Sequence, residues 1–221
     1  MRRRRLGNRF VNPSLERFPL PNVARLCSRD NLSMTTVSDS PLAPAPRSLL
    51  EAEMLPAIQV VVMGVAGCGK SAVGRLIAQQ LALPLIEGDD FHPPGNIRKM
   101  QQGIALTDED RADWLHSLGA ELARHPEGVV LTCSALKAAY RDSLRGAAAR
   151  LHFVHLAITE AESLRRVGQR ADHFYPPSLV ASQFEALQDP SAEPGVLTLA
   201  ADAPLAQLAL SSVAWLKAFR W

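Results

Sequence analysis

The sequence predicts an α/β protein in which a five-stranded parallel sheet is flanked by helices on both faces. From residue 57 onward, short apolar runs alternate with helical patterns, as they do in parallel sheets wound with helices. A glycine-rich turn joins the first apolar run to the first helical pattern. The chain has 221 residues, 47% of them hydrophobic, which is enough for one domain with a sizeable core. No apolar run approaches the length of a membrane span, so no membrane partner is expected.

Five strands are expected where β-branched and aliphatic residues form short runs. The first run, IQVVVM, is apolar and β-branched and leads directly into the glycine-rich turn. The expected strands cover residues 58–63, 84–87, 129–133, 151–156 and 196–200.

Seven helices are expected where apolar residues recur at helical spacing. In the first, apolar residues between positions 73 and 81 lie on one side, as in an amphipathic helix. Thr107, with Asp110 three residues later, resembles a capping box for the third helix. The expected helices cover residues 70–81, 96–102, 108–124, 136–145, 160–168, 176–187 and 205–219. Residues 56–221 are therefore expected to form one domain.

The first 55 residues differ from the rest in composition. They are rich in Pro, Ser and Arg and lack sustained periodicity, which is typical of disorder. We interpret residues 1–55 either as a disordered basic extension, with a weak likeness to a transit peptide, or as an over-extended start. In the second case Met34 or Met54 begins the protein.

Charge and cysteine content narrow the expected partners and compartment. Residues 1–55 hold nine arginines and five acidic residues, whereas the remainder holds 15 basic and 17 acidic residues. The folded part is thus near neutral, and a nucleic-acid partner is not expected. Cys27, Cys68 and Cys133 have neither metal-ligand spacing nor the even number typical of a disulfide set. A reducing, cytoplasmic location is expected.

The turn after the first strand has the pattern GVAGCGKS, a complete G-x-x-x-x-G-K-S phosphate loop between a strand and a helix. Such a loop predicts a P-loop NTPase fold that binds a nucleoside triphosphate, although a glycine-rich turn without nucleotide is the alternative. Lys70 is expected at the β- and γ-phosphates, and the Ser71 hydroxyl at Mg²⁺. The expected nucleotide-binding residues are Gly64, Val65, Ala66, Gly67, Cys68, Gly69, Lys70 and Ser71.

Acidic residues follow the second strand, at the edge of the sheet where ligands bind in open α/β folds. Asp89 is expected to face the γ-phosphate and to orient or deprotonate an attacking hydroxyl. It is also the carboxylate expected nearest to Mg²⁺, because the third strand does not end in an aspartate. The alternative for Asp89, and more strongly for Asp90, is that it only caps the next helix.

Two basic clusters are candidates for binding an anionic substrate. Lys137, Arg141 and Arg145 share one helix face, which either binds the substrate or is a solvated stripe. Arg165, Arg166, Arg170 and His173 lie in a segment, about residues 165–190, that is expected to be a mobile lid. His173 alone would more often be structural than catalytic.

Several segments, taken together, resemble the thermoresistant-type gluconokinases, a family of small kinases related to adenylate and shikimate kinases. The segments occur in family order and span residues 58–190. They are MGVAGCGKSAVG, GDDFHPPGNIRKM, GIALTDEDRADWL, CSALKAAYRDSLR, RADHF and SQFEALQDP. The GDxxHPxxNIxKM and CSALKxxYRDxLR segments are much more specific than the phosphate loop, which alone would indicate only the superfamily.

The resemblance implies phosphorylation of D-gluconate at its 6-hydroxyl by ATP and Mg²⁺, giving 6-phosphogluconate and ADP. It implies that Asp89 meets the 6-hydroxyl, and that His92, Lys137 and Arg141 hold gluconate. Arg166 and Arg170 would act from the lid. Members of that family are commonly homodimers.

Two other functions are compatible with the residues. A related kinase could phosphorylate shikimate, a nucleotide or a different sugar acid. A nucleotide-binding module without catalysis could use the arginine-rich first segment to reach nucleic acid or an acidic partner. The near-neutral core and the presence of Lys70, Ser71 and Asp89 argue against this second class.

Overall fold

The computed structural model describes residues 57–169 and 175–219. The N-terminal segment, residues 1–55, lies outside the described residues. Five parallel strands form one sheet in the order β2-β3-β1-β4-β5, which confirms the predicted fold class. The strands are β1 Ile58–Met63, β2 Leu85–Glu87, β3 Gly128–Thr132, β4 Leu151–Ala157 and β5 Val196–Ala200.

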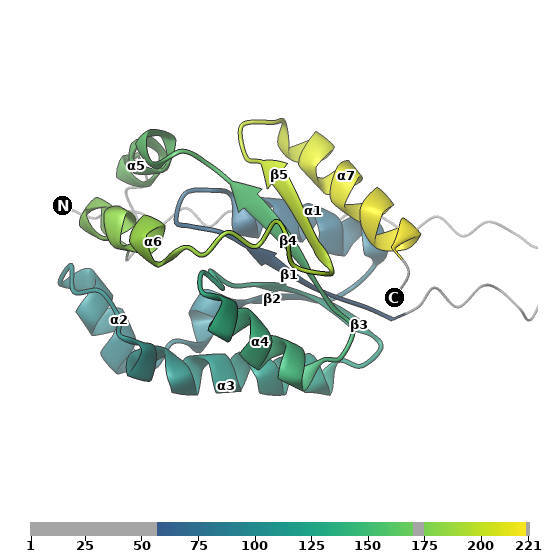
Figure 1. Ribbon diagram of the computed structural model, residues 1–221, viewed down its shortest axis with the longest axis horizontal. Coiled ribbons are helices and arrows are strands. Elements are labelled where there is room, and N and C mark those ends of the chain that lie inside the picture. The colour runs from purple at the N-terminus through teal and green to yellow at the C-terminus, as the bar shows by residue number, and fades with distance from the viewer. Residues whose placement is uncertain (1–56, 170–174, 220–221) are drawn as a thin grey trace, which may run out of the picture. The chain divides into compact units, whose positions relative to one another are not determined.

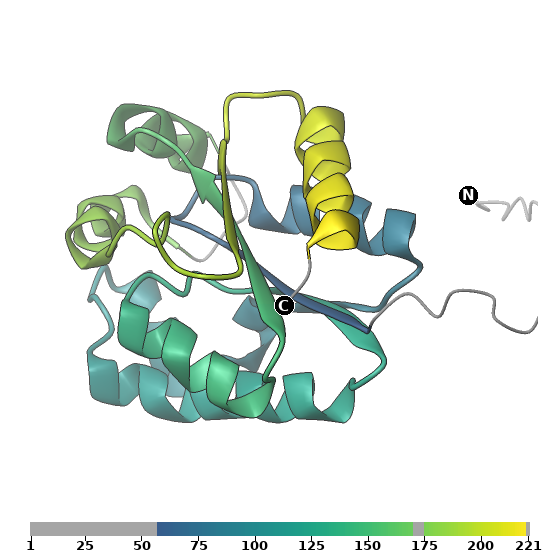
Figure 2. The ribbon, with the colours of Figure 1, turned by 45° about the vertical axis from the view of Figure 1, so that its right-hand side comes forward.

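Helices cover both faces of this sheet (Figures 1 and 2). The helices are α1 Lys70–Leu81, α2 Pro94–Gln101, α3 Asp108–Arg124, α4 Ala138–Ala147, α5 Glu160–Gly168, α6 Val180–Ala186 and α7 Leu205–Ala218, with 3-10 turns η1 Gly88–Phe91 and η2 Pro177–Leu179. On one face, α1 and α7 pack a buried apolar layer that includes Val73, Ile77 and Leu208. On the other face, α3 and α4 contribute Trp114 and Leu144 to a second layer.

The helix boundaries differ from the sequence prediction at three places. The second helix begins earlier than expected, at Pro94, which occupies a first-turn position where its missing N–H is not needed. The fourth begins at Ala138 because residue Ala135 adopts a left-handed conformation, with φ of 44°. The segment expected as one helix over 176–187 is a 3-10 turn followed by the short helix α6.

The capping box of α3 is confirmed. The Thr107 hydroxyl accepts a hydrogen bond from the Asp110 N–H at 3.3 Å, and the Asp110 carboxylate accepts one from the Thr107 N–H at 3.0 Å. Lys99 of α2 pairs with the same carboxylate at 2.6 Å. The start of α3 is therefore linked to α2. This link fixes the position of one wall of the site described below.

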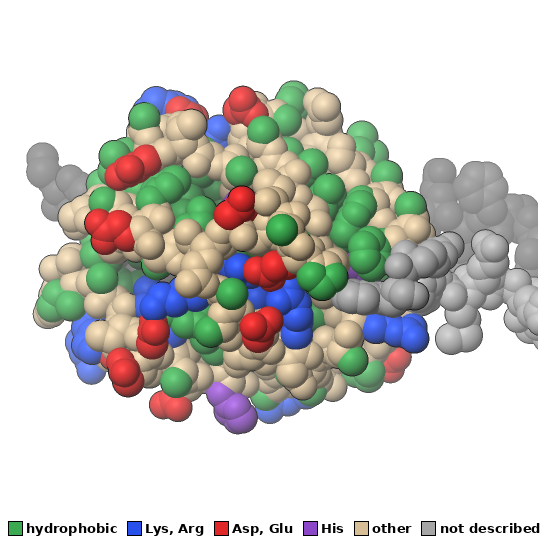
Figure 3. Space-filling view, viewed as in Figure 1, with side chains coloured by type: hydrophobic (Ala, Val, Ile, Leu, Met, Phe, Trp, Pro, Cys, Tyr) green, Lys and Arg blue, Asp and Glu red, His purple; other side chains and the backbone are tan. Residues whose placement is uncertain are grey.

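Charged side chains of both signs are interspersed on one face of the molecule. On the face shown in Figure 3, acidic side chains lie next to basic ones. Within the described residues, none of the helices combines the length and apolar character needed to cross a membrane.

Candidate active site

The phosphate loop connects the end of β1 to α1 at the carboxyl edge of the sheet. The Lys70 ammonium donates to the carbonyl oxygens of Gly64 and Val65 at 3.0 and 3.1 Å, so its charge lies over the start of the loop. Gly69 precedes α1 with φ of 100°, a conformation that favours glycine, and no side chain caps that helix. The N–H groups of the first turn of α1 are thus available to an anion, as the loop pattern predicts.

A cavity of about 420 Å³ extends from the phosphate loop to the N-terminal part of α3. Lys70 and Ser71 line its phosphate-loop end. Asp89, His92 and Arg111 line it as well and bring both signs of charge to the same space. The structure therefore joins a nucleotide-type loop to a polar chamber, which is the arrangement that phosphoryl transfer between two bound substrates requires.

Asp89 lies in η1 and lines the cavity, whereas Asp90 is exposed. The position of η1 depends on Trp114, whose indole N–H donates to the Gly88 carbonyl at 2.8 Å in the buried layer under the sheet. Asp89 is thus carried on a turn that is anchored to the core, in a place from which it can reach a substrate hydroxyl.

His92 stacks on Trp114, with ring centroids 4.2 Å apart and planes 15° apart. Burial lowers the pKa of His92 to about 4, although the nearby Asp89 charge partly opposes this shift. The imidazole is therefore neutral at physiological pH. Its buried Nδ1 atom has no hydrogen-bond partner among the described residues, which fits a site that receives a polar ligand.

Ser71 reaches a carboxylate that the sequence analysis missed. The Ser71 hydroxyl donates to Glu87 Oε2 at 2.9 Å, and the Thr132 hydroxyl donates to the same oxygen at 2.6 Å. Glu87 is the last residue of β2, so the carboxylate hydrogen-bonded to Ser71 is Glu87 and not Asp89, the carboxylate expected nearest to the metal. Its place beside the loop could have been inferred from the parallel sheet order.

The donors near Ser71 suit a hard cation. Hydroxyl and carboxylate oxygens are the groups that Mg²⁺ prefers, and a nucleotide-bound Mg²⁺ usually keeps several waters and few protein ligands. Over the described part of the chain, no three His, Cys, Asp or Glu side chains cluster as a metal site. Ser71, with Glu87 beside it, is therefore the fitting place for Mg²⁺ bound to phosphates.

Arg111 is a second cavity residue that the sequence analysis missed. Its guanidinium donates to the carbonyl oxygens of Leu106 and, at 3.2 Å, Thr107, which fixes it at the start of α3. It lies 5.8 Å from the centre of the Tyr140 ring. Because its position depends on how α3 packs, only the TDEDR segment itself could have pointed to it. Arg111 can bind a carboxylate in the cavity.

Lys137 does not line the cavity. Its ammonium pairs with the Asp108 carboxylate at 2.7 Å, and the same carboxylate accepts a hydrogen bond from the Tyr140 hydroxyl. This pairing raises the pKa of Lys137 and lowers that of Asp108. The structure therefore gives Lys137 a partner within the protein, next to the cavity wall.

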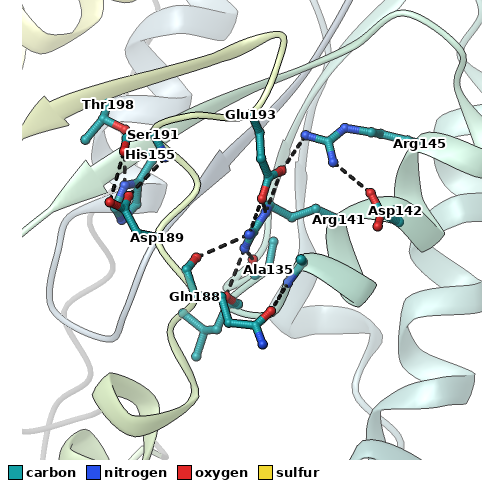
Figure 4. Close-up of polar contacts among 12 residues, drawn as sticks. Ala135, Arg141, Asp142, Arg145, His155, Gln188, Asp189, Ser191, Glu193 and Thr198 are labelled. Carbon is teal, nitrogen blue, oxygen red and sulfur yellow. Dashed lines mark hydrogen bonds and ion pairs between the residues drawn. The ribbon is translucent and has the colours of Figure 1, made fainter.

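Arg141 lies in the protein interior, fully buried, and not in the cavity (Figure 4). Its Nη1 atom donates to the Ala135 and Leu136 carbonyl oxygens at 2.8 and 2.9 Å. Its Nη2 atom donates to the Gln188 carbonyl at 3.2 Å and to the Glu193 carboxylate, which also accepts from Nε at 3.0 Å. Every nitrogen of the guanidinium is occupied. Arg141 therefore has a structural role and is not brought to the cavity, and its expected role in holding gluconate stays a prediction.

Arg166 lies on α5, where it pairs with Glu162 at 2.6 Å and donates to the Ala201 carbonyl at 3.1 Å. Through these contacts the Arg166 side chain links α5 to the loop that follows β5. Arg170 and His173 lie outside the described residues, and the mobility of the segment 165–190 stays a prediction. The structure thus brings Lys70, Ser71, Asp89 and His92 together in one cavity, and the arginines that line this cavity are Arg75 and Arg111.

Comparisons with known proteins agree with this geometry. A family model described as an AAA domain matches residues 60–194. The chain is 44% identical to the thermosensitive gluconokinase of Escherichia coli over 136 residues, 60% of this chain and 73% of that protein. It is 38% identical to the thermoresistant gluconokinase of the same species over 161 residues, 71% and 92% of the two chains. The crystal structure of a gluconokinase from Sinorhizobium meliloti superposes with a TM-score of 0.68 at 46% identity, covering 73% of this chain and 92% of that one. The chain belongs to the gluconokinase family of P-loop kinases.

Proposed function

We propose that this protein transfers the γ-phosphate of ATP to the 6-hydroxyl of D-gluconate. The observation that carries the proposal is the single cavity shared by the phosphate loop and the Asp89, His92 and Arg111 side chains. The identity to gluconokinases supports the choice of gluconate as the acceptor. The products are 6-phosphogluconate and ADP.

The residues of the cavity divide the work as follows. The loop N–H groups and Lys70 bind the phosphates, and Lys70 neutralises charge on the transferring group. Ser71, with Glu87 beside it, would hold Mg²⁺, which would supply further charge neutralisation on the phosphates. Oxygen O6 of gluconate forms the new bond to the γ-phosphorus while the bond to ADP breaks, and its proton passes to the Asp89 carboxylate.

Two further residues fit the acceptor. The cationic Arg111 guanidinium matches the carboxylate of gluconate, which is the one charged group of that substrate at neutral pH. The neutral His92 imidazole, with its unpartnered Nδ1 atom, can exchange hydrogen bonds with the hydroxyl groups of a polyol. We also propose that Arg166 and Arg170 approach the phosphates.

We also propose a cytoplasmic location. Both cysteines in the described part of the chain, Cys68 and Cys133, are free and buried, as is usual in a reducing compartment.

An acceptor panel tests the proposed function. ADP release is measured with ATP, Mg²⁺ and D-gluconate, and in parallel with shikimate, nucleoside monophosphates, other aldonates or no acceptor. Release that depends strongly on gluconate supports the proposal. Turnover with another acceptor would keep the mechanism but change the substrate, and ATP binding without turnover on any acceptor would contradict catalysis.

A further inference from the structure

The backbone of Ala66, in the phosphate loop, is held at both its N–H and its carbonyl oxygen by side chains from outside the loop. Its N–H donates to Gln183 Oε1 at 2.6 Å, and its carbonyl oxygen accepts a hydrogen bond from the Ser163 hydroxyl at 2.7 Å. Ser163 is fully buried in α5, and Gln183 lies in α6 and lines the cavity. Two helices that follow β4 therefore fix the two successive peptide groups that flank the Ala66 Cα atom.

Ala66 lies at the end of the loop where the transferring phosphate is expected. The Lys70 ammonium, which binds the terminal phosphates in such loops, is 3.0–3.1 Å from the carbonyl oxygens of the two residues before Ala66. The next residue, Gly67, has φ of 78°, and a Cβ atom there would lie 3.1 Å from the Ser163 carbonyl oxygen. The loop therefore has little room to move towards α5. Its other restraint is the hydrogen bond from the Ala66 N–H to Gln183.

Gln183 also contacts the part of the cavity wall that faces the acceptor. It lines the cavity together with Ser182 and Tyr175, whose hydroxyl donates to the Leu179 carbonyl at 2.9 Å. Tyr175, Leu179 and Ser182 line the same cavity. Asp89 and Arg111 line this cavity as well, so this wall belongs to the space that also holds the proposed acceptor site.

We propose that Gln183 is a positioning residue for phosphoryl transfer. Its carboxamide fixes the backbone N–H of Ala66 near the terminal phosphate, and its place in the cavity lining beside Tyr175 ties that backbone to the cavity wall. The acceptor hydroxyl and the γ-phosphorus then meet in line. This inference rests on the proposed function for its acceptor, but the nucleotide end of the contact is independent of which acceptor is used. Because a misplacement of about 1 Å costs roughly 100-fold in rate, one side chain at this junction controls turnover.

Gln188 provides a matched control. Its side-chain oxygen also accepts a backbone N–H, that of Ala138 at 2.7 Å, but Gln188 is exposed and does not line the cavity. Gln183→Met and Gln188→Met each remove one such hydrogen bond while keeping the length of the side chain. Thermal melting shows whether both variants are folded, and Gln183→Ala replaces Gln183→Met if the methionine does not fit.

Two measurements test whether Gln183 is a positioning residue. At saturating ATP and gluconate, kcat of Gln183→Met is expected to fall about 10- to 100-fold, and that of Gln188→Met to stay within about twofold of wild type. By calorimetry, Gln183→Met is expected to weaken a non-hydrolysable ATP analogue about fivefold more than ADP, because Ala66 lies at the third phosphate. Equal kcat in the two variants would overturn the proposal. If the wild type does not phosphorylate gluconate, the proposed function fails, and equal weakening of the ATP analogue and ADP would then overturn the role of Gln183 separately.

Discussion

Replacing Glu193 by alanine tests the structural role of Arg141. The Arg141 guanidinium is fully buried, and the Glu193 carboxylate is its counter-charge, with hydrogen bonds from Nε at 3.0 Å and from Nη2. Removing one partner of a buried ion pair costs about 3–5 kcal/mol, because the other charge is left without compensation. The Glu193 side chain is 22% exposed, so we expect the lower limit, about 3 kcal/mol. For a domain of this size, that loss lowers Tm by about 6–12 °C.

Asp142→Ala is the control for this variant. Asp142 pairs with Arg145 at 2.9 Å, but its side chain is 70% exposed, so the pair contributes about 0.5 kcal/mol or less. Thermal unfolding of the three proteins, followed by circular dichroism, gives the comparison. A Glu193→Ala protein that melts within about 2 °C of wild type would refute the reasoning. So would a lowered KM for gluconate at unchanged Tm, which is the result expected if Arg141 were a substrate ligand that Glu193 restrains.

The same contact predicts a pH dependence of stability. Hydrogen bonding from Arg141, assisted by Arg145, holds the pKa of Glu193 below its ordinary value of 4.5. The folded state therefore favours the ionised carboxylate, and this stabilisation is complete above the ordinary pKa and is lost as the pH falls through the folded pKa. Between neutral pH and the acid limb, the difference in Tm between wild type and Glu193→Ala should shrink. A difference that stays constant into the acid limb would contradict the assignment.

Three further variants or titrations follow from the site. Asp89→Asn should lower kcat about 10²- to 10⁴-fold with little change in ATP affinity, and near-normal kcat would refute its role as the base. Glu87→Gln should raise the Mg²⁺ concentration that gives half-maximal rate while leaving KM for gluconate unchanged; an unchanged Mg²⁺ dependence would remove Glu87 from the metal site. The His92 imidazole should titrate near pH 4 by NMR, since burial lowers its pKa, so its contribution to stability is lost as the pH falls from about 6.5 to about 4. A midpoint near 6.5 would show that His92 is solvated.

The fold was predictable because its signals are local. The apolar run of β1 and the phosphate loop that follows it identify a parallel sheet, and the Thr107–Asp110 capping box marks the start of α3 to the residue. The helix boundaries that were predicted wrongly depend on backbone conformation, which hydrophobic periodicity does not reveal. Ala135, just before the expected start of α4, has a left-handed backbone, and the segment after Pro176 begins as a 3-10 turn.

The candidate site was only partly predictable because some of its contacts are not local. The spacing of Lys137, Arg141 and Arg145 places them on one helix face, but it does not show what that face meets. In the structure, Arg141 and Arg145 both bind the Glu193 carboxylate, some 50 residues later in the chain (Figure 4). Glu87 was not predicted because it is the last residue of its strand, whereas ligand-binding residues were expected only after the strand ends.

The most direct test of the central claim is the identity of the product made from ATP and D-gluconate. Phosphorus NMR of the reaction catalysed by the wild-type protein should show 6-phosphogluconate accumulating together with ADP. The Lys70→Met protein, with the same melting behaviour, should form neither product, because the charge that neutralises the transferring phosphate is gone. Phosphate on a different hydroxyl, ADP with free phosphate alone, or full activity in Lys70→Met would contradict the account.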